Sequence, residues 1–208
     1  SECKGAGEWE KKTKEIIAYT AAEQEQIWKI ILAEPGNVGY AAVAFQMETG
    51  IRVGELLALK WSDVDISRCR MKIHATIVNP QCTYQAEYHP SAKSKSSNRT
   101  VPLTPKAISI LKNLQKRRQT EWVFEQDQER YSYKKLIYQT KKLCREARIK
   151  YHGEHVFRHT FATNCYYKGI DIKILSRMMG HSSVQVTYNI YVNLYGDGFD
   201  DMYAALCF

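Results

Sequence analysis

The stretch of residues 65–103 constrains the fold most. Its apolar side chains do not follow helical spacing but occur at every second position, at Met71, Ile73, Ala75 and Ile77. Polar residues separate them, as expected for a strand with one buried face. The segment 91–99 is too hydrophilic for a core and would connect two strands. The expected strands of this stretch are 71–77, 83–88 and 100–103.

The sequence on both sides of this stretch has helical periodicity. Thr20 and Glu23 form the pattern of a capping box, and Thr104-Pro105 is typical of an N-cap followed by proline at the first helical position. Gly50 is expected to end a helix of small apolar residues. Helices are expected from Thr20 to Pro35 and at 40–49, 53–59, 106–118, 132–148, 155–168, 171–179 and 183–194. The prediction is a mainly α domain with a small three-stranded antiparallel β-sheet.

Composition narrows the class of protein. Thirty Lys and Arg against 22 Asp and Glu give a net charge of +8, which favours a polyanionic partner, with nucleic acid ahead of a membrane surface. The chain contains no apolar run near the roughly 20 residues of a membrane helix, and no secretory signal opens it. Its six cysteines form no CxxC pair and are interpreted as reduced thiols of a cytoplasmic protein.

Three regions are expected along the chain. Residues 1–18 are charged and are interpreted as a linker from a missing N-terminal DNA-binding domain. Residues 19–195 would form the catalytic domain. Residues 196–208 begin with a glycine-rich break and carry an apolar stripe at helical spacing, which predicts a tail helix that packs against another subunit.

Basic and imidazole groups at helix starts and turns are candidates for chemistry. Arg52 follows a predicted chain reversal, and His155 and Arg158 share one face at a helix start. Two guanidiniums can bind the oxygens of a phosphate as forks. His181 follows the end of a helix, whose negative dipole would favour a protonated or donating imidazole. Tyr191 lies ten residues further on, although core packing is the ordinary role of such a tyrosine.

In chain order, these residues fall in five motifs that resemble those of the tyrosine recombinases, or phage integrases. The subgroup that the sequence resembles most is the integrases of temperate phages and conjugative transposons. The motifs correspond to the first arginine box, the β-hairpin lysine loop, the His-x-x-Arg box, the Leu-Gly-His-Ser box and the nucleophile helix of the family. They occupy residues 49–65, 93–103, 155–163, 179–183 and 186–194.

The resemblance implies a catalytic set and a set of DNA contacts. The implied catalytic residues are Arg52, Lys93, His155, Arg158, His181 and Tyr191. The implied DNA contacts are Lys60, Lys95, Arg99 and His159. Spacing from His181 favours Tyr191 as nucleophile, with Tyr188 as a distant second.

The resemblance also implies a metal-independent reaction without a cofactor. Tyr191 would attack a DNA phosphate, His155 would accept its proton, and Arg52 and Arg158 would stabilise the charge. Lys93 would protonate the departing 5′ oxygen as general acid. The product would be a 3′-phosphotyrosine, exchanged through a Holliday junction by a dimer to tetramer on double-stranded DNA, with accessory DNA-bending proteins as possible partners.

Two metal sites are alternatives. Nearby carboxylates could serve a metal nuclease, although Glu55 is better explained as orienting Arg52 or an imidazole. Three histidines include the i, i+4 pair of zinc hydrolases, but Val156 stands where their catalytic glutamate would be. The residues of these alternatives are Glu55, Asp63 and Asp65 for the nuclease, and His152, His155 and His159 for zinc.

Two further alternatives keep the DNA partner. A DNA-binding protein without catalysis would have the same net charge, but it would not need these residue types in this order. A topoisomerase-like enzyme would use the same chemistry as a monomer on one duplex. The sequence does not separate it from a recombinase.

Overall fold

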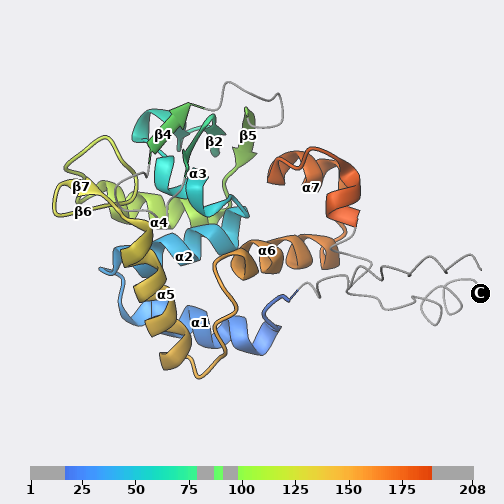
Figure 1. Cartoon of the computed structure of the whole chain (residues 1–208), viewed down its shortest axis with the longest axis horizontal. Helices are drawn as coiled ribbons and strands as arrows, with labels where there is room; N and C mark the ends of the chain where they lie inside the picture. Colours follow the sequence, from blue (N-terminus) through green and yellow to red (C-terminus); the bar gives the residue numbers. More distant parts are fainter. Residues whose placement is uncertain (1–16, 79–86, 91–97, 189–208) are drawn as a thin grey trace, which may run out of the picture.

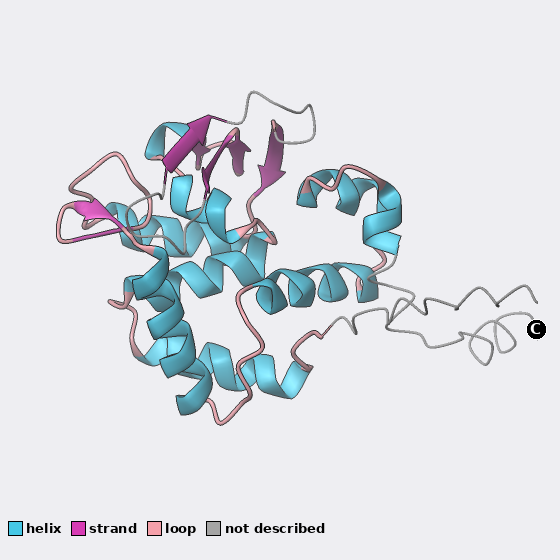
Figure 2. Cartoon of the chain, in the orientation of Figure 1, coloured by secondary structure: helices cyan, strands magenta, loops and turns pink. Residues whose placement is uncertain are grey.

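The computed structural model describes residues 17–78, 87–90 and 98–188. Helices form the body of the molecule, and the longer strands gather at one end of it (Figure 2). The helices are α1 (Ala21–Ala33), α2 (Val38–Thr49), α3 (Val53–Ala58), the 3₁₀ turn η1 (Trp61–Asp63), α4 (Pro105–Gln115), α5 (Tyr133–Glu146), α6 (His155–Tyr167) and α7 (Ile172–Met179). A further helical stretch covers residues 184–188.

Helix α2 is the centre of the packing. It contacts α1, α3, α4, α5 and α6 and lies between them in Figure 1. Small and aromatic residues let it do so, because Ala42 and Ala44 permit close approach while Tyr40 and Phe45 fill the space between helices. Its one buried amide is satisfied, since Gln46 Nε2 donates to the Ile51 carbonyl at 3.1 Å.

The predicted helix ends are confirmed where their caps can be checked. Thr20 caps α1 with a reciprocal capping box to Glu23, and Thr104 caps α4 with Pro105 in its first turn. Gly50 ends α2 in the left-handed conformation at φ +65°. These short-range patterns need no tertiary information, which explains why the sequence predicts them well.

The sheet prediction is right in kind and wrong in detail. The segment 71–77 is not one strand, because the pairing partner changes at His74, whose Nε2 lies 2.7 Å from Asp63 Oδ1. Before it, β2 (Arg70–Ile73) pairs with β1 (Val64–Asp65) and β5 (Arg99–Pro102); after it, β3 (Ala75–Val78) pairs with β4 (Glu87–Pro90). A small hairpin, β6 (Glu125–Gln126) and β7 (Glu129–Arg130), was not predicted.

The core has two parts among the described residues. The larger cluster surrounds α2 and extends under the sheets. The smaller cluster joins α6 to α7 through Phe161, Leu175 and Met179. Cys69, Cys144 and Cys165 are free thiols. No described helix has the length and apolar character needed to cross a membrane.

Two glycines with positive φ allow a matched test of the contact between α2 and α6. A Cβ at Gly50 would overlap the Phe161 ring, whereas one at Gly169 (φ +74°) would meet nothing within 4 Å. We expect Gly50→Ala to lower the free energy of unfolding by about 2–4 kcal/mol and Gly169→Ala by about 1 kcal/mol. Urea denaturation measures both, and equal losses would contradict this account of the contact.

Candidate active site

Arg52 lies at the N-terminus of α3, two residues after the left-handed turn at Gly50. Its Nη1 donates to Glu55 Oε1 at 3.0 Å, and its Nη2 donates to the Gly180 carbonyl at 2.7 Å. The side chain is still 40% exposed. Arg52 is therefore fixed at two points and keeps N–H groups available to an anion in solution.

Arg158 reaches the same place from α6 and is buried. Its Nη1 donates to the Gly50 carbonyl, and its Nη2 donates to the Met179 carbonyl at 2.7 Å. Burial, then the charges of Arg52 and Arg99, lower its pKa, against the opposing effect of Glu55. The two predicted phosphate-binding arginines thus meet at the C-terminal end of α7, although 106 positions separate them in the sequence.

Glu55 sits between Arg52 and Arg99. Its Oε1 accepts from Arg99 Nη1 and its Oε2 from Arg99 Nη2, both at 2.8 Å, in a bidentate ion pair. Burial alone would raise the pKa of this carboxyl, but the hydrogen bonds and charge of Arg99, and then of Arg52, hold the pKa below its ordinary value. The prediction that Glu55 orients Arg52 is supported by this geometry; no imidazole bonds to it among the described residues.

The DNA contact of Arg99 stays a prediction, and in this structure its side chain is directed into the protein. Its side chain is 7% exposed, and its Nε donates to the Met178 carbonyl at 2.7 Å in addition to the pair with Glu55. The charge of Arg99 made it resemble a DNA contact in the sequence, but its place at the start of β5, packed on α7, directs it inward.

His155 is the first residue of α6 and lies one turn before Arg158. Partial burial of its ring, then the charges of Arg158 and Arg52, lower its pKa. At neutral pH the imidazole is therefore uncharged, which is the state that a proton acceptor needs.

His181 follows the end of α7, and its Nδ1 lies 2.7 Å from Thr187 Oγ1. Burial, followed by the charges of Arg158, Arg52 and Arg99, lowers its pKa to about 4. The expectation of a protonated imidazole is corrected, because desolvation and three nearby guanidiniums outweigh the helix dipole. A donating imidazole remains compatible with the structure: when Thr187 donates to Nδ1, Nε2 carries the remaining proton.

Thr187 was missed as a site residue. It is fully buried and fixes the His181 ring. The signal in the sequence was a threonine among the apolar and aromatic residues that occur at helical spacing from Val184 onwards, because a polar side chain that becomes buried needs a hydrogen-bond partner.

Lys60 and His159, two other predicted DNA contacts, both contact neighbouring groups or are buried in this structure. Lys60 Nζ is 3.1 Å from Glu121 Oε2 and 4.8 Å from the ring centres of both Tyr88 and Trp122. His159 has a buried Nδ1 without a hydrogen-bond partner, and burial, then the charges of His155 and Arg158, lower its pKa to about 4. Their contact with DNA stays a prediction, and for Lys60 it would require the ammonium to leave this site.

Three predicted site residues lie outside the described residues: Lys93, Lys95 and Tyr191. Their roles stay predictions. The second candidate nucleophile, Tyr188, is described and is 51% exposed.

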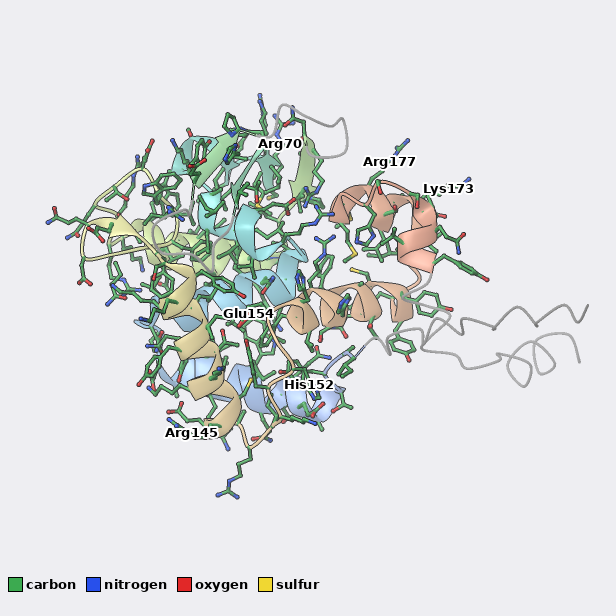
Figure 3. All side chains as sticks on the ribbon, viewed as in Figure 1. Arg70, Arg145, His152, Glu154, Lys173 and Arg177 are labelled. Carbon is green, nitrogen blue, oxygen red and sulfur yellow. The ribbon has the colours of Figure 1, made fainter. Side chains whose placement is uncertain are left out.

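The candidate ligands of the two alternative metal sites are not grouped together in the described part of the chain. His152 lies against Tyr19, with ring centres 6.2 Å apart, and Figure 3 shows it beside α1. Asp63 accepts from the Lys60 backbone, and Glu55 is saturated by arginines. Among the described residues, no three His, Cys, Asp or Glu side chains are grouped as a metal site would require.

The partly exposed guanidinium of Arg52 and the buried one of Arg158, beside uncharged imidazoles, make a positively charged site that suits a phosphate-like anion, set in a mainly helical fold. Over residues 14–196 the chain matches the phage integrase family. A tyrosine recombinase described as XerC-like, from Caldanaerobacter subterraneus subsp. tengcongensis, is 30% identical over 207 residues, which cover 89% of this chain and 52% of that protein. The chain therefore belongs to the phage integrase family.

Solved structures agree with this fold. The Tn1549 transposon integrase in complex with circular intermediate DNA has a TM-score of 0.73 at 21% identity, covering 94% of this chain and 69% of that one. A lambda integrase tetramer bound to a Holliday junction has a TM-score of 0.60 at 19% identity, covering 86% and 49%. The predicted fold class is confirmed, and the chain spans about half the length of the curated relatives it matches.

The low pKa values at this site predict a pH dependence of stability. His159 and His181 both have a pKa of about 4 in the folded chain, against about 6.5 when unfolded. The unfolded chain therefore binds more protons between these values, so the free energy of unfolding should fall as pH decreases from 6.5 towards 4. Denaturation at pH 7 and pH 5 should show this loss, and His181→Gln should reduce it. A His181 ring that titrates near pH 6.5 by NMR would contradict the assignment.

Proposed function

We propose that this chain is the catalytic part of a site-specific DNA recombinase, the integrase or transposase of a mobile element, acting in the bacterial cytoplasm. The observation that carries the proposal is the convergence of Arg52 and Arg158 on the end of α7, next to His155 and His181, in a member of the phage integrase family. These groups suit the stabilisation of a pentavalent phosphate in DNA.

The reaction begins with attack of the Tyr191 oxygen on a DNA phosphorus. His155 takes the phenolic proton, while Arg52 and Arg158 bind the non-bridging oxygens and His181 donates a further hydrogen bond. The tyrosine O–P bond forms as the bond from phosphorus to the 5′ oxygen breaks. Lys93 gives that oxygen its proton, which leaves a 3′-phosphotyrosine and a free 5′-hydroxyl.

The phosphotyrosine conserves the bond energy of the phosphodiester. Attack by the 5′-hydroxyl of a second duplex reverses the step and joins the two strands, and one such exchange produces a Holliday junction. The positive charge that the step needs comes from side chains, so we expect cleavage to proceed in the presence of EDTA.

The assembly is part of the proposal. We assign double-stranded DNA as substrate and a dimer to tetramer as the active form. The Tn1549 integrase in complex with circular intermediate DNA supports the substrate, and the lambda integrase tetramer bound to a Holliday junction supports the assembly. Residues 1–18 would connect to a DNA-binding domain, 19–195 would form the catalytic domain, and 196–208 would pack against a neighbouring subunit. Accessory DNA-bending proteins would act on the same complex.

Trapping of the covalent intermediate tests the nucleophile. Cleavage of a nicked suicide substrate releases a short fragment that carries the free 5′-hydroxyl. Religation is then impossible, so the wild-type protein should accumulate a covalent DNA adduct. Tyr191→Phe should abolish this adduct while DNA binding stays within about threefold, because only the attacking oxygen is lost. Peptide mapping identifies the linked residue.

Tyr188→Phe is the matched control for that experiment and should retain the adduct. An adduct that persists in Tyr191→Phe and disappears in Tyr188→Phe would overturn the assignment. Relaxation of supercoiled DNA by the monomer without strand exchange would instead favour the topoisomerase alternative.

Replacement of Arg52 by lysine tests whether the site needs a fork or only a charge. Lysine keeps the positive charge, but its donors all lie on one nitrogen, so it cannot reproduce the planar fork by which two nitrogens of Arg52 bind Glu55 and the Gly180 carbonyl. We expect Arg52→Lys to slow cleavage by about 100-fold or more in a protein that is still folded. A wild-type rate on the suicide substrate would show that charge alone suffices.

A further inference from the structure

Arg99 stands beside the two phosphate-binding arginines but differs from Arg52 in exposure. Both of its terminal nitrogens bind Glu55, and its Nε binds the Met178 carbonyl, so each nitrogen of the guanidinium has a protein acceptor. The side chain is almost fully buried, whereas 40% of the Arg52 side chain is exposed. Arg158 is buried as well, but its terminal nitrogens bind neutral carbonyls, whereas Arg99 pairs with a carboxylate, so the charge of Arg99 is balanced within the protein.

Glu55 shares its two oxygens evenly between the arginines. Oε1 accepts from Nη1 of Arg52 at 3.0 Å and from Nη1 of Arg99 at 2.8 Å. Oε2 accepts from the backbone N–H of Arg52 and from Nη2 of Arg99, both at 2.8 Å. The carboxylate therefore orients Arg52 through one guanidinium hydrogen bond and leaves the remaining guanidinium donors to other acceptors.

The contact of Arg99 with α7 is equally close. A Cβ placed on Gly180 would lie 2.7 Å from Arg99 Nη1 and 2.8 Å from its Cζ, so the guanidinium packs directly on this glycine. Gly180 also accepts from Arg52 and precedes His181 in the chain. Arg99 thus touches both the carboxylate that orients Arg52 and the turn that presents His181.

We propose that Arg99 is a positioning residue for the cleavage step: it balances the charge of Glu55, so that Arg52 stays available to the phosphate, and it fixes the turn before His181. The proposal rests on the function proposed above. It concerns a residue that does not touch the reacting atoms and acts through Arg52 and His181.

The charge balance gives the physical reason. Arg99 and Glu55 form a neutral buried pair, which leaves the charges of Arg52 and Arg158 uncompensated for an incoming phosphate. Without Arg99, a buried carboxylate would lack its bidentate partner, and a bidentate pair with Arg52 would satisfy it. Arg52 would then be drawn inward and its charge neutralised, and Glu55 would compete with the phosphate.

The test measures single-turnover cleavage of the suicide substrate at saturating DNA. Arg99→Gln should cleave about 100-fold more slowly than wild type, with DNA affinity changed less than about threefold. Adding Glu55→Gln to this variant should recover about tenfold of the lost rate, because the competing carboxylate is gone. A purely structural role predicts that the second substitution gives no recovery.

Arg177→Gln is the matched control. It removes one positive charge from the exposed side of α7, where Figure 3 shows the side chain pointing away from the helices below it. It should cleave at the wild-type rate. Arg99→Lys, which keeps the charge without the fork, serves if Arg99→Gln does not fold, and it should cleave about tenfold more slowly than wild type.

Two outcomes would overturn the proposal: a wild-type cleavage rate in the Arg99 variants, or no recovery in the double variant. A wild-type chain that forms no DNA adduct would instead contradict the proposed recombinase function. The two failures stay distinct, because NMR titration of the Glu55 carboxyl needs no DNA. The pKa of Glu55 should rise in Arg99→Gln, because the hydrogen bonds from Arg99 are the main cause that lowers it.

Discussion

The site depends on three successive backbone carbonyls at the C-terminal end of α7. Met178 accepts from Arg99, Met179 from Arg158 and Gly180 from Arg52, so each carbonyl holds a different guanidinium. The last carbonyls of a helix have no partner within it and carry the negative end of its dipole. This helix end can therefore gather three cations where their mutual repulsion would otherwise keep them apart.

This cluster of arginines helps to explain why the neighbouring imidazoles are uncharged. The pKa values of His155 and His181 are lowered by loss of solvent and then by the same arginines. A neutral His155 can accept a proton, and a neutral His181 can still donate one hydrogen bond. Burial first, and then the arginines, thus set the acid–base state of the imidazoles at the proposed phosphate site.

Local patterns in the sequence predicted local features. The caps at Thr20 and Thr104, the helix end at Gly50 and the association of Arg52 with Glu55 all depend on residues within a few positions of one another. The features that the sequence did not predict depend on residues that are far apart in the chain. The strand breaks at His74, where the pairing partner changes and the ring lies next to Asp63. Arg99 is buried against α7 and bonds to Met178, 79 positions away. The charge of His181 is set by arginines on three separate elements, which no local pattern contains.

The arginines also join the two parts of the hydrophobic core. Helix α7 packs through the small cluster with α6, whereas α3, which begins after Arg52, belongs to the large cluster around α2. Leu175 and Met179 of α7 are buried in the small cluster, and the three carbonyl bonds are a second, polar attachment of this helix to the rest of the chain. Any local opening of α7 would break all three bonds together and release His181 with them. The groups proposed to bind the phosphate therefore depend on one helix end, because the hydrogen bonds that attach α7 are the same ones that hold the arginines in place.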